Sequence, residues 1–130
     1  MVDPATVWLT EPGDHDDVPL GGDGAQVLRV EDVYEETEEC GHGEKRAGVV
    51  AIVETTTGHG NRVLVSATFD LDDGDSLEVQ GVAERIQHHD HPSFRGRLGV
   101  VGGTGKYKGR RGQVDVDVCN PKRWIIDLDP

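Results

Sequence analysis

One segment, RGRLGVVGGTGKYKGRRGQVDVDV at 95–118, constrains the fold more than any other part of the sequence. It begins with a short apolar run and ends with valine alternating with aspartate at every second position. A period of two is typical of a β-strand with one buried face. The glycines between, at 102, 103, 105, 109 and 112, suit a backbone with positive φ or one close to another backbone. The segment predicts two strands joined by a tight glycine turn.

The spacing of these glycines excludes a Walker-type phosphate loop. That loop requires G-x-x-x-x-G-K-[ST], whereas Val100 stands at the first glycine position and Tyr107 replaces the hydroxyl residue. No helical pattern follows whose N-terminus would hold the anion. We therefore expect no phosphate site here.

The same stretch, GVVGGTGKYKGRRGQV, resembles the GGTG-x-[FY]-x-G-[AV]-x-G signature of plant allene oxide cyclases and dirigent proteins. The similarity extends to EDVYEE, AGVVAIVE and SLEVQGVAE. The resemblance implies an eight-stranded antiparallel barrel of the calycin type. It does not imply one particular reaction.

The rest of the chain supports an all-β fold in one domain spanning 1–130. Strand patterns separated by turn residues occur six more times, and we find no helical pattern. Eight strands joined by hairpins suit an up-and-down barrel or a sandwich, and the resemblance favours the barrel. The six further strands are expected at 5–11, 26–35, 46–57, 62–71, 76–87 and 122–129.

The alternating face of most strands is apolar and predicts a dry lumen. Val50 and Phe69 lie on such faces, and Gly81 and Ala83 are small enough to leave space for a ligand. The segment 46–57 is apolar on both faces, which predicts a homo-oligomer, a dimer or trimer, that covers the outer face.

Polar candidates come from two strands. Arg29 and Glu31 share one face of their strand, and a buried carboxylate with a cationic partner is typical of functional sites. The alternative is that Leu28 and Val30 point inwards and the Arg29–Glu31 pair is solvated. In the resemblance, the cyclases' Glu and Asn on the first strand correspond to Trp8 and Thr10, so the plant reaction is not expected.

We therefore expect a cofactor-independent cyclase or isomerase that shapes a largely apolar polyketide- or lipid-like metabolite, for example in a [4+2] ring closure. The resemblance to small bacterial polyketide cyclases supports this expectation. The alternative is a dirigent-like barrel that carries or orients an apolar ligand without turnover. Catalysis is expected from Arg29 and Glu31. Substrate contacts are expected from Trp8, Thr10, Val50, Phe69, Gly81 and Ala83.

The composition restricts the classes of partner that the protein is expected to bind. The net charge of −12 argues against nucleic acid and anionic membranes, which require a basic surface. No apolar run is long enough to span a bilayer, so a cytoplasmic protein is expected. The two cysteines, Cys40 and Cys119, are expected to be free thiols. The histidines of 88–91 and the acidic run 14–17 lack usual zinc and calcium ligand spacings, so no metal is expected.

Overall fold

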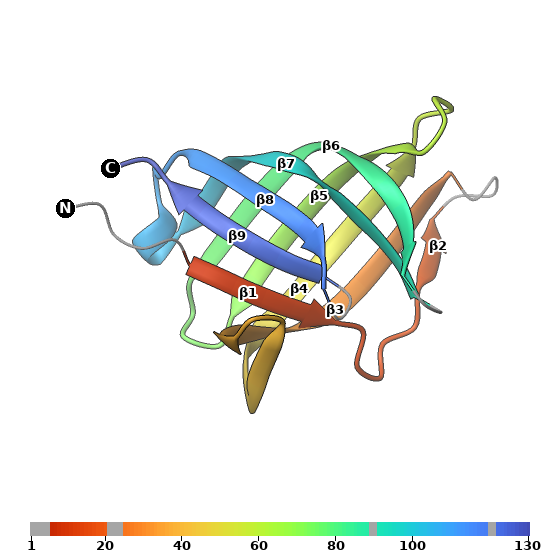
Figure 1. The fold of residues 1–130 in the computed structure, drawn as a ribbon. Helices are drawn as coiled ribbons and strands as arrows, with labels where there is room; N and C mark the ends of the chain where they lie inside the picture. Colours follow the sequence, from red (N-terminus) through yellow and green to blue (C-terminus); the bar gives the residue numbers. More distant parts are fainter. Residues whose placement is uncertain (1–5, 21–24, 89–90, 120–121) are drawn as a thin grey trace.

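The computed structural model describes residues 6–20, 25–88, 91–119 and 122–130, and the side chains of the same residues except 87, 88, 91 and 92. Nine strands form one antiparallel sheet in the order β1-β9-β8-β7-β6-β5-β4-β3-β2. β1 also pairs with β3, which closes eight of these strands into a barrel (Figure 1). The elements are β1 Thr6–Glu11, β2 Val18–Leu20, β3 Gln26–Glu38, β4 Gly41–Thr56, β5 Arg62–Leu71, β6 Ser76–His88, β7 His91–Thr104, the 3₁₀ turn η1 Gly105–Tyr107, β8 Gly112–Val118 and β9 Lys122–Leu128.

The all-β barrel predicted from the sequence is confirmed, and the limits of several strands differ from those expected. β2 lies within the segment 11–24, which the sequence predicted to be a loop, and pairs with β3 outside the closed barrel. β3 and β4 also run further than expected, through most of the segment TEECGHGE. The sequence did not predict this extension, because the side chains of the extended hairpin are mostly polar and show little apolar alternation.

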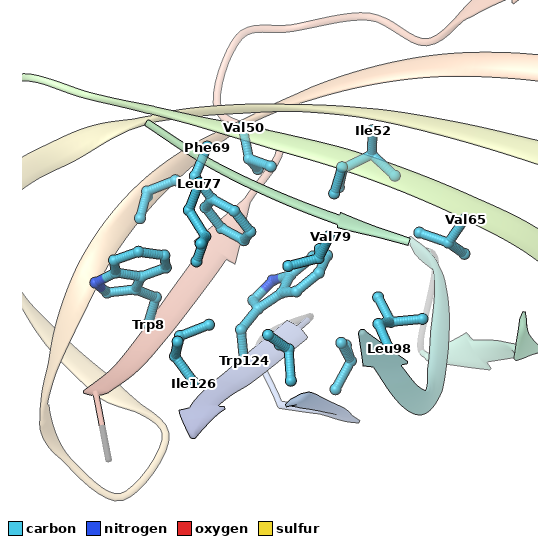
Figure 2. Close-up of a cluster of buried hydrophobic side chains, with 14 of the residues drawn as sticks. Trp8, Val50, Ile52, Val65, Phe69, Leu77, Val79, Leu98, Trp124 and Ile126 are labelled. Atoms are coloured by element: carbon cyan, nitrogen blue, oxygen red, sulfur yellow. The ribbon is translucent and has the colours of Figure 1, made fainter. Parts of the chain in front are cut away.

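The core fills the lumen. Alternate side chains from every barrel strand point inwards, and the aromatic rings of Trp8, Phe69 and Trp124 pack together among aliphatic residues (Figure 2). Val50 and Phe69 are fully buried, and Ala83 is 2% exposed. These inward positions follow the period-two patterns of their strands.

Gly81 and Ala83 do not leave space, contrary to the prediction. A Cβ placed on Gly81 would lie 2.8 Å from Leu98 Cδ2 and 3.1 Å from Leu98 Cα. A Cβ on Gly96, in the neighbouring strand, would lie 3.0 Å from Ala83 Cα. The small residues therefore allow β6 and β7 to approach closely, and Leu98 occupies the interior beside them.

The glycine turn between β7 and β8 places one aromatic side chain at the end of the barrel. A Cβ on Gly103 would lie 2.7 Å from Tyr107 Cβ and 2.8 Å from the Ser76 carbonyl oxygen, so only glycine fits. Gly105 has φ +61°, which favours glycine. Tyr107, held by this turn, is 6% exposed and joins the core cluster.

A disulfide corrects the prediction of free thiols. Cys40 in the β3–β4 turn and Cys119 directly after β8 are bonded, with their Cα atoms 5.6 Å apart. The hairpin end projects beyond the sheet beneath β1 (Figure 1). A second contact holds it, because Arg123 Nε and Nη2 donate to the two carboxylate oxygens of Glu36 at 2.6 and 2.9 Å. The closed barrel brings together cysteines that are 79 residues apart, a proximity the spacing alone does not indicate.

The outer face of β4 is apolar, as the sequence indicated, and neighbouring strands extend it. Leu64, Val82 and Val101 are 49%, 46% and 56% exposed. The homo-oligomer remains a prediction, which light scattering tests. Among the described residues, no helix has the length and apolar character needed to cross a membrane.

Candidate functional site

One half of the lumen is polar. Arg29 and Glu31 are 8% and 2% exposed, so this face of β3 is the buried one. Leu28 and Val30, on the opposite face, are half-buried. The other buried polar side chains among the described residues are those of Thr10, Glu54, Ser93 and Lys122.

Glu31 is the centre of a buried network. Lys122 Nζ donates to Glu31 Oε2 at 2.6 Å, and the Thr10 hydroxyl donates to Glu31 Oε1 at 2.8 Å. Trp124 Nε1 in turn donates to Thr10 Oγ1 at 2.8 Å. The network connects β1, β3 and β9, which become neighbours only when the barrel closes. It places a carboxylate, an ammonium and a hydroxyl together inside the barrel.

Arg29 and Glu31 do not form the ion pair that the sequence suggested. Arg29 donates to Glu54 through Nε and to Asp17 through Nη1. Glu54 is 2% exposed, and its other oxygen lies 3.9 Å from Arg85 Nε. Residues two apart on a strand point to the same face, but each side chain here finds a closer partner on another strand. The lumen therefore contains two separate ionic groups.

Five of the six aromatic residues form a continuous series along the lumen. The centroid distances are 6.3 Å for Tyr107–Trp8, 4.7 Å for Trp8–Phe69, 5.0 Å for Phe69–Trp124 and 5.6 Å for Trp124–Phe94. Lys122 Nζ lies 5.3 Å from the centre of the Phe94 ring. The series joins the end of the barrel closed by Tyr107 to the polar half.

A pocket of about 480 Å³ lies at the Tyr107 end. Trp8 and Tyr107 contribute aromatic surface to it, and Leu71 and Ala47 contribute aliphatic surface. Its remaining wall is polar and comes from β1, β3, β4, the β5–β6 turn and η1: Thr6, Glu35, Thr37, Gly43, Glu44, Lys45, Arg46, Asp72, Asp73 and Lys106.

The predicted site residues therefore divide between these places. Glu31 and Thr10 meet in the network, Arg29 belongs to the neighbouring ionic group, and Trp8 lines the pocket. Val50 and Phe69 pack in the lumen core, as do Ala83 and the backbone near Gly81. Their substrate contacts remain predictions.

Two buried charged residues were not predicted from the sequence, although the apolar alternation of their strands indicated that they point inwards. Lys122 lies two positions before Trp124 on the apolar face of β9, and Glu54 lies two positions after Ile52 on that of β4. Extending each alternating pattern by one step places both side chains inside. Their charge argued for solvent exposure, but each is 2% exposed or less.

No group of three metal-ligating side chains occurs among the described residues. Asp17 of the acidic run contacts Arg29. The side chains of the segment 88–91 lie outside the described residues.

No family model matches the chain, and no curated protein matches it. A solved structure with a similar fold is that of a protein named pyocyanin demethylase, at 12% identity and a TM-score of 0.60. The alignment covers 99% of this chain and 100% of that one. At this identity the likeness shows the barrel fold alone. The comparisons do not confirm the resemblance to allene oxide cyclases.

Proposed function

We propose that the protein is a cofactor-independent isomerase or cyclase that binds a largely apolar metabolite in the barrel, with Glu31 as the acid–base group. The observation that carries the proposal is the contact of 2.6 Å between Glu31 and Lys122, whose side chains are 3% and 1% exposed. Burial of two charges is costly, and a hydrophobic pair of similar volume is often as stable. Retention of the pair is therefore a reason to assign it a role.

The proposed chemistry is a proton transfer without net oxidation. Glu31 takes a proton from a carbon or oxygen of the substrate and returns it at another atom after the bonds rearrange. The Lys122 ammonium stabilises the negative charge that develops on a carbonyl oxygen in between. The Thr10 hydroxyl fixes the position of the carboxylate. Because Glu31 is 2% exposed, side chains of the lumen must move when the substrate binds.

A structural neighbour that is by name an enzyme, pyocyanin demethylase, gives further support for catalysis on this fold. We do not transfer its reaction. The second candidate is a binding barrel without turnover. The hydrogen bonds of the network favour this second candidate, because Glu31, Thr10 and Trp124 each already have a partner within the protein.

The test works with an unidentified substrate. A metabolite extract of the native host is incubated with the protein, and untargeted mass spectrometry searches for a compound converted into an isomer of identical mass. The matched control is Glu31→Gln/Lys122→Met, which keeps the side-chain volumes and leaves no unpaired buried charge. We expect conversion by the wild type alone. Retention of a compound without conversion would favour the binding barrel, and equal conversion by the control would overturn the role of Glu31.

A further inference from the structure

The strand pairing of the barrel wall is interrupted beside the polar half of the lumen. β1 and β2 both pair with the edge of β3 that does not face β4, β1 with residues 32–35 and β2 with residues 26–28. Three residues of β3, 29–31, lie between these pairings, whereas six residues, 12–17, connect β1 to β2. The connection is therefore too long to continue the strand. It leaves the wall as a loop, here called the mouth loop, directly outside the two charged residues of β3 (Figure 1).

The mouth loop and the short strand after it bury little surface. Residues 13–19 are all exposed, and β2 has three residues. Side chains attach the loop to β3, since His15 Nε2 lies 3.3 Å from Asp32 Oδ1 and Asp17 contacts Arg29. A segment with few buried apolar contacts opens locally at a small cost in free energy. The loop can therefore leave the wall while the barrel stays folded.

Arg29 is paired with two carboxylates that differ in their surroundings. Its Nε donates to Glu54 of β4, and its Nη1 donates to Asp17 of the mouth loop. The Glu54 side chain is 2% exposed, whereas that of Asp17 is 48% exposed. Glu54 thus belongs to the barrel interior, and Asp17 reaches Arg29 from outside. The place that the Asp17 carboxylate occupies is accessible from solvent and already has the size of a carboxylate.

The charges around Arg29 require an anion when Asp17 leaves. Arg85 Nε lies 3.9 Å from Glu54 Oε1, beyond hydrogen-bond distance, and this buried nitrogen has no hydrogen-bond partner among the described residues. Two guanidinium groups therefore share the single interior carboxylate of Glu54, and Asp17 balances the second positive charge. Because Arg29 is 8% exposed, leaving its charge without a partner is costly. A carboxylate from solution removes that cost.

The position of Arg29 relates this place to the proposed acid–base group. Arg29 and Glu31 share the inward face of β3 two residues apart, so their Cα atoms are separated by roughly 7 Å. A molecule held on Arg29 by one end can therefore extend along the lumen towards the Glu31 carboxylate. Guanidinium groups bind carboxylates through charge-assisted hydrogen bonds, which fix orientation as well as position.

We propose that Arg29 binds the carboxylate of the ligand and that Asp17 occupies this position until the ligand displaces it. The ligand is then a carboxylic acid with an otherwise apolar body, and it enters between β1 and β2 when the mouth loop opens. The inference rests on the proposed function only in taking this acid to be the metabolite that Glu31 rearranges. It also gives a role to the acidic run 14–17, whose other carboxylates repel a bound anion and so keep the loop open around it.

The test uses phenylacetate and its uncharged amide, phenylacetamide, on the ¹⁵N-labelled full chain. The two probes have similar shapes and differ in charge. The NMR signal of Arg29 Nε–H reports a change at the guanidinium. We expect phenylacetate to shift this signal saturably and phenylacetamide to bind at least about tenfold more weakly. Equal binding of the two probes, or an Arg29 signal that stays unchanged at saturation, would overturn the inference.

Removal of the competing carboxylate is expected to strengthen binding. If Asp17 occupies Arg29 about nine-tenths of the time, Asp17→Ala lowers the apparent Kd of phenylacetate about tenfold. Asp16→Ala is the matched control, because it removes the same charge from the same exposed loop. Equal gains in the two variants would show a general effect of charge and would refute the exchange.

Removal of the guanidinium is expected to abolish the preference for the acid. Arg29→Met/Glu54→Gln removes the cation without leaving a buried carboxylate, and its Kd for phenylacetate should rise at least about tenfold. Arg97→Met/Asp115→Asn changes an exposed pair on the outer surface in the same way and is the control. Circular dichroism checks that both variants keep the β-sheet signal of the wild type. Equal losses in the two variants would refute the site.

The Glu31→Gln/Lys122→Met variant separates the two proposals. Phenylacetate binding that requires Arg29 and persists in this variant supports the inference, even where no metabolite is isomerised. Binding that is lost in this variant and kept in Arg29→Met/Glu54→Gln places the carboxylate on Lys122 instead. That result would overturn the inference without contradicting the proposed function. Binding that both variants keep, or that both lose equally, would overturn the inference as well.

Discussion

Glu31 on β3 and Lys122 on β9 meet inside the barrel at 2.6 Å, although 91 residues separate them in the sequence. Neither strand pairs with the other, since β1 lies between them. Thr10 on that intervening strand donates to the same carboxylate and accepts from Trp124. The pair is thus a connection across the seam where the barrel closes, as well as the proposed chemical centre.

Removal of one partner is expected to destabilise the protein strongly. Lys122→Met leaves the Glu31 carboxylate buried without a cation, and the free energy of unfolding is expected to fall by about 3–5 kcal/mol. Glu31→Gln leaves the Lys122 ammonium unpaired and is also expected to lower the free energy of unfolding. In Glu31→Gln/Lys122→Met, the combined loss is expected to be smaller than the sum of the two by about 2 kcal/mol.

Urea unfolding of the four proteins measures this coupling. The exposed pair Arg97–Asp115, at 2.9 Å on the outer surface, provides the control cycle, whose coupling is expected to stay below about 1 kcal/mol. Strictly additive losses at Glu31 and Lys122 would contradict the buried contact.

Thr10→Val tests the hydroxyl that links Glu31 to Trp124. The substitution keeps the side-chain volume but leaves the buried Trp124 N–H without its acceptor, which is expected to cost about 1–3 kcal/mol. Thr6→Val, at an exposed position of the same strand, is the control and is expected to change stability by less than about 0.5 kcal/mol. Thermal unfolding compares the two variants, and equal midpoints would argue against the hydrogen-bonded chain.

The all-β fold was predictable from the sequence because its strands carry a strong period of two, whereas the choice of a barrel over a sandwich came from the resemblance to allene oxide cyclases and dirigent proteins. Alternation placed Arg29 and Glu31 on one face of their strand but left open whether that face points inwards. The partners of these residues were not predictable. Register between distant strands decides that Glu31 meets Lys122 and Arg29 meets Glu54, and alternation within one strand contains no such information.

The space inside the barrel could not be predicted from the sequence either. Gly81 is consistent either with an empty space or with a close approach of backbones, and the position of Leu98 on β7 decides between them. The disulfide could not be predicted from the sequence for a similar reason. Cys40 and Cys119 are remote in sequence, and only the closure of the barrel brings their Cα atoms within 5.6 Å.

Gly103→Ala is expected to destabilise the end of the barrel at which Tyr107 packs. The added methyl group would lie 2.7 Å from Tyr107 Cβ and 2.8 Å from a backbone oxygen, so the turn must shift, at a cost of about 1–3 kcal/mol. Gly43→Ala is the matched control, because its methyl group meets nothing within 4 Å. Urea midpoints measure the difference. A Gly103→Ala midpoint no lower than that of the control would show that Tyr107 is not held by this contact.

The disulfide is expected to stabilise the barrel considerably. It closes a loop of 79 residues, for which chain entropy alone gives about 4.5 kcal/mol. The variant Cys40→Ser/Cys119→Ser should therefore unfold at a lower urea concentration than the oxidised wild type, and dithiothreitol should lower the midpoint of the wild type only. An effect of the reductant on the double variant would point to a cause other than this bond.

Glu36 is expected to make stability depend on pH in the acid range. Its hydrogen bonds from Arg123, with a smaller one from the Cys40 backbone, lower the pKa of Glu36 below its ordinary value despite the opposing effect of burial. The unfolded chain therefore binds this proton more readily than the folded protein. The contribution of Glu36 is fully present above the ordinary glutamate pKa, about 4.3, and is lost as the pH falls through the lowered folded value.

The measurement compares wild type with Glu36→Gln between pH 7 and pH 3. At pH 7 the wild type should be the more stable protein, because only the carboxylate pairs with Arg123, and the difference should shrink below about pH 4. Glu84→Gln is the control, since Glu84 contacts Arg95 at 3.5 Å with both side chains at least half exposed, and a pair of this kind contributes little. A difference between wild type and Glu36→Gln that stays constant across this range would mean that the protonation of Glu36 is not coupled to folding.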